Sequence, residues 1–342
     1  MGLMMTSRQD LRILMVLYVC IGICPVFLHG LPDVMNILIL CLIWGVVAAS
    51  WDLIMGFAGI FTFGQVAFYV IGAYTSAIVT RTFGISPWFG ILLGGVLTGG
   101  IGVLVGLPCL RLKGSYVALV TFAVHMILEP FLRSEAGRAI GTGGPQGILS
   151  IPSLTLFGYT FNAMELVPWF YVVLSISFFC LLIIYFIIHS NWGLAFVALR
   201  DSETFARAIG INDFKYKLMV FGLSSFLTGL IGAVYAHYVG MLSTRLLGLD
   251  LFLILMVMLV LGGLGRFPGA LIGAFIAVFL SEWLRPLETY RNVVFGALVV
   301  LLVIFVPQGI TGFLFPDDRP GPLRRLGALL NRKTPDGPPS NH

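Results

Sequence analysis

Apolar residues along this chain come in runs of roughly 20, separated by short segments that hold most of the charged residues. A run of that length crosses the hydrocarbon core of a bilayer as one helix. The pattern predicts an all-α integral membrane protein with about ten transmembrane helices (eight to ten), near 12–30, 34–56, 60–80, 88–108, 115–132, 166–189, 216–240, 251–264, 267–284 and 292–314. The eighth run is short, and a re-entrant segment is the alternative there.

Composition and charge agree with a membrane location. Hydrophobic residues make up 58% of the chain, charged residues 10%, and the mean hydropathy is +1.01. Of the 20 basic residues, ten spans put fourteen on the side of the N-terminus and six on the other side. The positive-inside rule therefore predicts a multi-pass protein of the cell inner (plasma) membrane with both termini in the cytoplasm. The net charge of +5 reflects this bias, and no nucleic-acid interface is predicted.

Motifs of catalysis are missing from the sequence. There is no Gly-x-x-x-x-Gly-Lys-Ser/Thr for ATP, no His-Glu-x-x-His for zinc and no Gly-x-Ser-x-Gly for a nucleophile. Four of the five cysteines fall within predicted spans, the fifth, Cys109, directly follows one, and they show no metal-ligand spacing. We therefore expect no enzyme activity, no cofactor and no metal site.

Glycine is frequent, and two patterns of it matter. Pairs four residues apart, such as Gly90/Gly94 and Gly102/Gly106, favour close approach of helices. The longest outer loop, 133–165, contains Gly141-Thr142-Gly143-Gly144-Pro145-Gln146-Gly147, which predicts a tight turn with unusual backbone angles rather than a phosphate site.

Few ionisable residues lie within the predicted spans, and each is a possible functional site because its burial in lipid is costly. Glu129 and Glu282 are near outer helix ends, and Asp52 is near an inner end, where headgroups can solvate them. His125 shares a helix face with Thr121 and Glu129. That polar stripe faces an aqueous cavity or another helix, and the sequence leaves both possibilities open.

The inner segment from Trp192 to Lys217 contains a short amphipathic helix, predicted from Ala198 to Gly210. One side of this helix gathers Arg200, Glu203, Thr204 and Arg207, and Glu203 can pair with Arg207 four residues on. Glu203, Ala206 and Gly210 form a stripe that another protein could approach closely. A helix resting on lipid headgroups is the alternative, and periodicity alone does not choose between them.

Four stretches together resemble the branched-chain amino acid permease family of ABC importers, in particular the LivM-type member of the LivH/LivM pair. The inner segment carries the most specific one, a Glu-x-x-Ala-x-x-x-Gly order typical of the cytoplasmic coupling loop of these permeases. The stretches are Gly56–Phe68 with Gly72-Ala73-Tyr74; Arg111–Ala118 with Thr142–Gly147; Ala198–Ile211 with Tyr216-Lys217-Leu218 and Gly229–Ala233; and Val260–Gly265 with Pro268-Gly269-Ala270, Gly296 and Pro307-Gln308-Gly309.

The resemblance implies an ABC importer permease fold, with a transmembrane domain at 1–315, a coupling helix near 198–210 and a polar cytoplasmic tail at 316–342. It implies a permease subunit that moves branched-chain amino acids by alternating access, or urea or short-chain amides, while a separate subunit hydrolyses ATP. The implied partners are a second, LivH-type permease chain, two ATP-binding subunits on the cytoplasmic face, a soluble solute-binding protein outside and membrane lipid. A secondary transporter without an ATPase remains the alternative from another class.

Two groups of site residues follow. For coupling to the ATPase we expect Glu203, Ala206, Gly210, Arg200 and Arg207. For the translocation pathway we expect Gln65, Gly59, Gly64, Thr121, His125, Gly143 and Gly144, with the helix broken at Gly59 and Gly64. Gln65 stands where the family often has His, so it bears on the identity of the solute.

Overall fold

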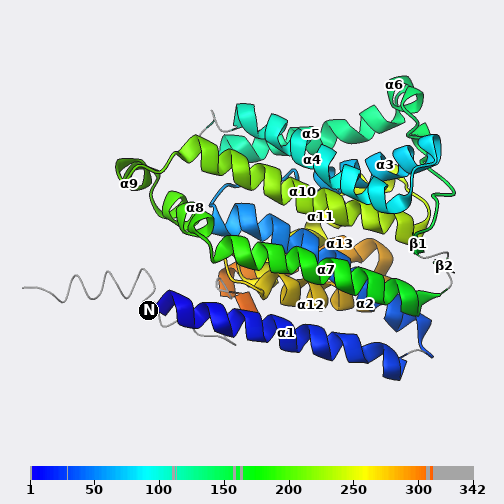
Figure 1. Ribbon diagram of the computed structural model, residues 1–342, viewed down its shortest axis with the longest axis horizontal. Helices are drawn as coiled ribbons and strands as arrows, with labels where there is room; N and C mark the ends of the chain where they lie inside the picture. The colour runs from blue at the N-terminus through cyan, green and yellow to red at the C-terminus, as the bar shows by residue number, and fades with distance from the viewer. Residues whose placement is uncertain are drawn as a thin grey trace, which may run out of the picture.

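The computed structural model describes residues 2–305, 309 and 310, except 29, 110, 111, 113, 157, 158 and 162–164. Within these residues the chain is almost entirely helical, as the sequence predicts (Figure 1). The predicted polar tail, 316–342, lies outside the described part of the chain.

Ten helices of at least fourteen residues occur in the described residues, one for each predicted span. Seven of the described helices are long and apolar enough to cross a membrane, whereas α11 and α12 are apolar but shorter. The ten helices are α1 (Gly2–Leu28), α2 (Pro32–Asp52), α3 (Gln65–Phe83), α4 (Pro87–Cys109), α5 (Ser115–Arg133), α7 (Leu166–Ile188), α10 (Asp213–Val239), α11 (Leu249–Gly262), α12 (Gly269–Trp283) and α13 (Arg291–Phe305).

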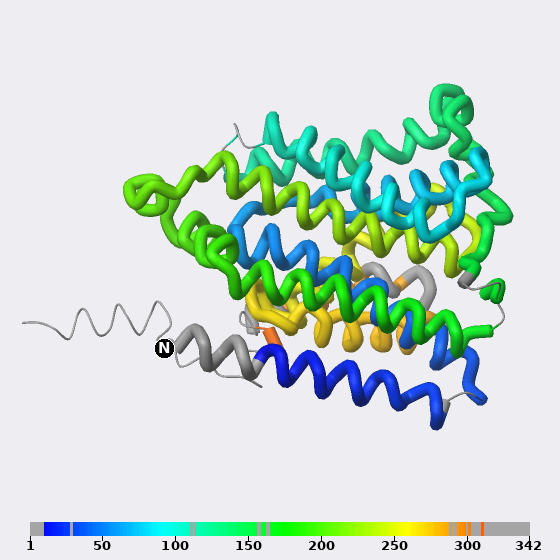
Figure 2. The backbone as a smooth tube through the Cα atoms, in the orientation of Figure 1, coloured from blue at the N-terminus to red at the C-terminus, as the bar shows by residue number. Residues whose placement is uncertain are grey.

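The helices run side by side between two ends of the molecule (Figures 1 and 2). One end, called here the α9 end, carries α8 (Asn191–Asp201) and α9 (Glu203–Ala208) together with the N-terminal end of α1. The opposite α6 end carries α6 (Glu135–Ala139) and a hairpin of β1 (Thr155–Leu156) and β2 (Tyr159–Thr160), paired antiparallel. The start of α1 and residue 200 thus lie at one end and the described part of loop 133–165 at the other, as the predicted topology requires, while the side of the membrane that each end faces stays a prediction.

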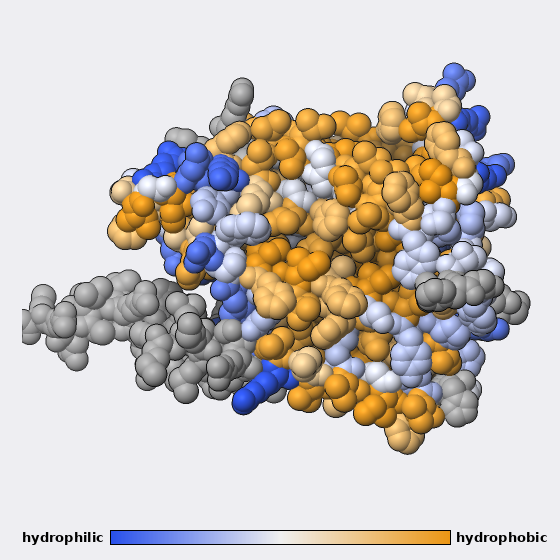
Figure 3. Space-filling view, viewed as in Figure 1, coloured by the Kyte–Doolittle hydropathy of each residue, from blue (hydrophilic) through white to orange (hydrophobic). Residues whose placement is uncertain are grey.

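An apolar surface covers the helices between these ends, and polar residues gather at the ends themselves (Figure 3). Exposed apolar side chains occur along the outer helices, such as Val19 on α1, Leu104 on α4 and Ile127 on α5. An apolar surface of this kind, on the face that Figure 3 shows, suits lipid rather than water. Helix α2 is enclosed by its neighbours, whereas α1 lies at the edge of the bundle (Figure 1).

Glycines let α10 pack closely on α3 and α4, as the spacing of glycines on α4 predicts. A Cβ on Gly72 of α3 would lie 2.1 Å from the carbonyl oxygen of Gly229 on α10. On α4, a Cβ on Gly94 would lie 2.8 Å from the Gly72 carbonyl oxygen, and one on Gly102 would lie 2.1 Å from the Ser225 hydroxyl. The small residues therefore allow a backbone contact that a larger side chain would prevent.

Candidate functional site

The segment predicted as one helix from Ala198 to Gly210 forms two helices, so that prediction is wrong. Ser202 separates α8 from α9 with an extended backbone (φ −163°, ψ 107°), and its hydroxyl accepts a hydrogen bond from the Phe205 N–H at 3.3 Å. Serine caps helix N-termini in this way, and its side chain competes with helix continuation. The break turns α9 away from α8, and α9 projects from the bundle (Figure 1).

The segment 203–210 exposes all of its residues except Ala206, rather than a single face. Ala206 is fully buried, so it is not available to a partner, while Phe205 and Ile209 are 64% and 58% exposed. Glu203 and Gly210 are exposed as expected. Gly210 has φ +89° and ends the helix, as its place in the sequence predicts.

The charged residues of α9 hold it against α10. Arg207 lies 3.5 Å from Glu203, the predicted pair, and 2.6 Å from Asp213 at the start of α10. Glu203 also pairs with Lys217 of α10. These contacts fix the position of α9 relative to a membrane-spanning helix, so a force on α9 reaches α10 directly.

The helix that precedes α3 ends in an irregular segment. After α2 the chain forms a π-helical turn, η1 (Leu53–Phe57), and residues 59–64 are neither helix nor strand until α3 begins at Gln65. Gly59 has φ +69°, and the predicted break near Gly59 and Gly64 is confirmed, whereas the span expected from residue 60 begins as a helix five residues later. Discontinuous helices place backbone polar groups inside a membrane protein, where they line binding sites in transporters.

Side chains of neighbouring helices satisfy the backbone of this discontinuous segment. The Trp51 indole N–H donates to the Thr62 carbonyl at 2.9 Å, and the Phe63 N–H donates to the Thr121 hydroxyl at 2.9 Å. Without such partners, each buried backbone group would be costly in a lipid environment. The structure thus brings two predicted pathway positions together, because Thr121 contacts the segment next to Gly64.

Asp52 is a functional candidate that the sequence argument placed wrongly. Instead of being solvated near a helix end, its side chain is buried, and Oδ1 accepts a hydrogen bond from the Gly265 N–H at 2.7 Å. A Cβ on Gly56 would lie 2.1 Å from that Oδ1 and 2.3 Å from the Gly265 nitrogen. In the sequence, this contact could have been suspected from a carboxylate within a predicted span, Asp52, that is followed four residues later by Gly56.

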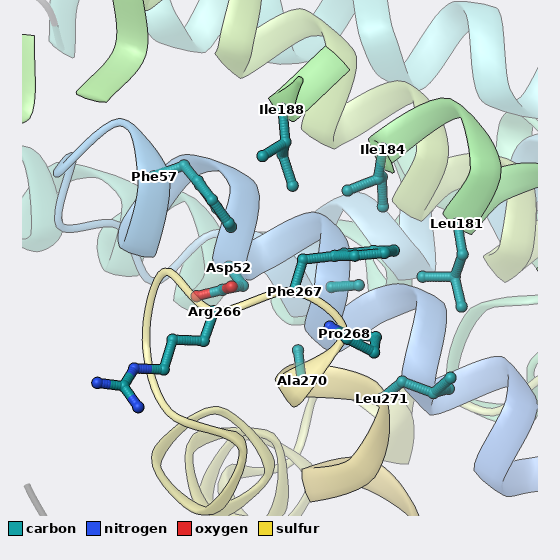
Figure 4. Close-up of a pocket in the computed structure, with 11 residues that line it drawn as sticks. Asp52, Phe57, Leu181, Ile184, Ile188, Arg266, Phe267, Pro268, Ala270 and Leu271 are labelled. Carbon is teal, nitrogen blue, oxygen red and sulfur yellow. The ribbon is translucent and has the colours of Figure 1, made fainter. Parts of the chain in front are cut away.

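A small pocket adjoins this contact (Figure 4). Its walls are mostly apolar side chains of α2, η1, α7, α12 and the α11–α12 loop, and Asp52 and Arg266 are the charged residues among those that line it. The Arg266 guanidinium points away from Asp52 (Figure 4). The Asp52 carboxylate is therefore held by loop backbone rather than by that arginine.

Arg200 contacts the same region from the other side, although it was predicted on the exposed face of the coupling helix. It stands in the last turn of α8, and its Nη1 donates to the Gly56 carbonyl oxygen at 2.8 Å. A Cβ on Gly59 would lie 2.5 Å from Arg200 Cγ. A predicted coupling residue and a predicted pathway residue are thus in direct contact.

Gln65, at the start of α3, is buried with its amide bonded to α10. Its Nε2 donates to the Ser224 hydroxyl at 3.1 Å and also to the Thr228 hydroxyl, and the Ser224 hydroxyl donates to the Ser50 carbonyl at 2.6 Å. Gln65 as a whole is only 1% exposed. In this conformation it joins α3, α10 and α2 rather than facing an open cavity.

His125 faces another helix, one of the two possibilities left open by the sequence. It is fully buried, and its ring lies 6.1 Å from that of Phe122 and 6.3 Å from that of Phe252 on α11. The Leu247 backbone is beside the ring, but among the described residues no hydrogen bond of good geometry reaches either nitrogen. Phe63 of the discontinuous segment packs on Phe252 at 5.3 Å, so His125 belongs to the same aromatic cluster.

Gly143 and Gly144 form the expected tight turn at the α6 end. Both have positive φ (73° and 61°), and a Cβ on Gly143 would lie 1.8 Å from the Gly147 carbonyl oxygen. The Thr142 hydroxyl joins this turn to α5, because it donates to the Leu132 carbonyl at 2.8 Å. Leu132 is eleven residues beyond Thr121, about 16 Å along the helix, so the turn is far from Gln65 and Thr121.

Comparison with known proteins identifies the family. The family model described as branched-chain amino acid transport system, permease component, matches residues 34–306. The chain is 28% identical over 336 residues to the high-affinity branched-chain amino acid transport system permease protein LivM of Salmonella typhimurium, covering 92% of this chain and 77% of that protein. It is 24% identical over 310 residues to the corresponding LivH of Escherichia coli K12, covering 84% of this chain and 96% of that protein. No solved structure matches the chain. The chain belongs to the family of branched-chain amino acid transport permease components.

Proposed function

We propose that this chain is a permease subunit of an ATP-driven importer that carries branched-chain amino acids across the cell inner membrane. The observation that carries the proposal is the family match from residue 34 to 306, which takes in α2 to α13. The likeness to both LivM and LivH proteins supports a core of two different permease chains, with this one in the LivM position. Urea and short-chain amides are the competing solutes.

The ATP-binding subunits dock at the α9 end in this proposal. Fourteen of the 20 basic residues assign that end to the cytoplasm by the positive-inside rule. There α9 presents Phe205 and Ile209 next to the exposed Glu203 and Gly210, a small apolar surface with a charged rim. A soluble binding protein delivers solute at the α6 end, and separate subunits hydrolyse ATP, since this sequence has no P-loop.

The solute route follows the discontinuous segment 59–64. A zwitterion cannot cross hydrocarbon unaided, because its charged groups would lose their hydrogen bonds to water. Backbone groups of the segment, the hydroxyl of Thr121, the amide of Gln65 and the imidazole of His125 can replace those bonds when the helices around them separate. Gly143 and Gly144 shape the outer loop at the entrance. Alternating access requires such a second arrangement, in which the Gln65 amide gives up its hydrogen bonds to α10 and bonds to the solute.

Reconstituted transport tests the proposal. The chain, its LivH-type partner, the ATP-binding subunits and the binding protein are placed in liposomes, and uptake of labelled leucine is measured with and without ATP. We expect ATP-dependent uptake of leucine that unlabelled isoleucine and valine compete for and that urea and acetamide do not. Uptake driven by an ion gradient without ATP would assign the chain to secondary transport. Uptake of urea in preference to leucine would show that urea, rather than a branched-chain amino acid, is the solute.

A Gln65→Leu variant tests the route separately. We expect a several-fold higher apparent KM for leucine at equal protein level, because the solute loses a donor and an acceptor. Thr98→Val is the matched control, since the Thr98 hydroxyl is also buried but donates to Gly94 on its own helix at 2.6 Å. An unchanged KM together with less protein in the membrane would show that Gln65 only packs α3 on α10.

A further inference from the structure

Three parts of the chain meet at the α9 end of the bundle, and Arg200 is in contact with all three. It stands in the last turn of α8, donates to the Gly56 carbonyl of η1 at 2.8 Å, and its Nη1 lies 3.0 Å from where a Cβ on Gly265 of the α11–α12 loop would be. The last carbonyls of a helix have no partner within it, and the negative end of the helix dipole attracts a cation. Arg200 therefore supplies a donor and a positive charge at the end of η1, where the helix α2–η1 is interrupted and its last carbonyls have no partner within the helix.

Glycines make this contact close. A Cβ on Gly59 would lie 2.5 Å from Arg200 Cγ and 3.2 Å from its Cα, and one on Gly265 would lie 2.9 Å from the Gly56 carbonyl oxygen. On the far side, Asp52 binds the Gly265 N–H at 2.7 Å. The end of α8, the end of η1 and the α11–α12 loop are thus packed backbone against backbone, and close-packed parts transmit displacement instead of absorbing it.

Arginine suits this position because its guanidinium donates in more than one direction. Nε donates to the Asp201 carboxylate at 3.2 Å, which orients the group, while Nη1 reaches Gly56. A lysine has a single flexible ammonium group and cannot hold both contacts in fixed geometry. Beyond Gly59 the discontinuous segment continues to Phe61, which is 47% exposed, and to Phe63, held by Thr121.

From these contacts we infer that Arg200 is a positioning residue, a clamp that carries movement of the α8–α9 hairpin (α8, Ser202 and α9) into the discontinuous segment 59–64. The inference rests on the proposed function, since an ATP-binding subunit must move the hairpin. It adds the particular connection: α8 moves, Gly56 and Gly59 follow through Arg200, and the segment changes its position against α5. The salt bridges of α9 to α10 form a separate connection that does not include Arg200.

Labelling of a cysteine in the segment tests the clamp in the reconstituted complex. Phe61→Cys is introduced into a chain whose five native cysteines are replaced, and its rate of reaction with a maleimide is measured with and without ATP and vanadate. The same measurement is made after adding Arg200→Met, Arg200→Lys, or Arg12→Met. Arg12 is the matched control, because it is an exposed arginine on α1 at the same end of the bundle.

We expect ATP to change the labelling rate several-fold in the parent chain and with Arg12→Met. With Arg200→Met the ratio should fall to about one, and leucine uptake should fall about tenfold or more, the effect of losing a charge-assisted hydrogen bond. Arg200→Lys should give an intermediate ratio. The ATP-binding subunits should still co-purify in every variant, because α9 is unchanged, and this separates uncoupling from loss of assembly.

Gly59→Ala gives an independent perturbation of the same contact, because its Cβ would displace the Arg200 side chain. It should uncouple labelling from ATP as Arg200→Met does. An Arg200→Met chain that assembles normally and keeps the full ATP-dependent ratio would refute the clamp alone. A parent chain that binds no ATP-binding subunit and shows no response to ATP would refute the proposed function, and the clamp with it.

Discussion

Replacing Gly72 by alanine should destabilise the bundle more than its size suggests. Gly72 lies on the face of α3 that meets α10, and the added Cβ would stand 2.1 Å from the Gly229 carbonyl oxygen and 2.4 Å from its Cα. An ordinary contact of this kind begins near 3.4 Å, so α3 and α10 must separate locally by about 1.3 Å. The neighbour is backbone, which cannot rotate away as a side chain would.

The expected cost follows from this displacement. Overpacking of a close-packed core by one carbon costs about 1–3 kcal/mol. Alanine at the same time favours the helix by up to about 1 kcal/mol over glycine, which offsets part of the cost. We therefore expect a net loss of roughly 1–2 kcal/mol in the free energy of unfolding, or a melting temperature lower by about 2–5 °C for a chain of this size.

Thermal unfolding of the purified chain in detergent checks this magnitude. Gly100→Ala on α4 is the matched control, because a Cβ there meets nothing within 4 Å. It makes the same chemical change in a membrane helix and should leave the melting temperature unchanged or slightly raised. If Gly72→Ala melts at the same temperature as Gly100→Ala, the close α3–α10 contact does not limit packing, and the argument from glycine spacing is refuted.

Three further predictions concern orientation, docking and pH. In a chain without native cysteines, Leu149→Cys (Leu149 is 54% exposed at the α6 end) should react with an impermeant maleimide added outside the cell, and Thr204→Cys on α9 only after permeabilisation; the reverse result would invert the topology. Phe205→Ser should reduce co-purification of the ATP-binding subunits while the chain still inserts, whereas Leu149→Ser should not; full retention by Phe205→Ser would move the docking surface elsewhere. His189 Nε2 donates a hydrogen bond to the Asp10 carboxylate, 3.3 Å away, which raises the pKa of His189 above its ordinary value. This contact between α1 and the end of α7 should therefore stabilise the chain fully below pH 6.5 and be lost as pH rises through the raised pKa. A melting temperature that falls over that range in the parent chain but not in Asp10→Asn would agree, and parallel curves would contradict it.

The sequence by itself determined the class of protein, its helices and its two faces. Ten apolar runs correspond to ten helices, because a membrane accepts a spanning chain only when its backbone bonds within each segment. Counting basic residues between those runs predicted which end faces the cytoplasm, and that assignment stays a prediction. Gly210 as a helix end, the Glu203–Arg207 pair and the turn at Gly141–Gly147 were also predicted, since each depends on neighbouring residues only.

Tertiary structure decided what those elements bring together. The helix breaks at Ser202, and in α9 Ala206 is buried while Phe205 is exposed; periodicity could not show this, because it assumed one continuous helix. The contact of Arg200 with Gly56 joins residues 144 positions apart, and that of Asp52 with Gly265 joins residues 213 apart. A helical pattern fixes which residues share a face, but the neighbour of that face depends on how all the helices pack, and a single sequence holds no direct record of that packing.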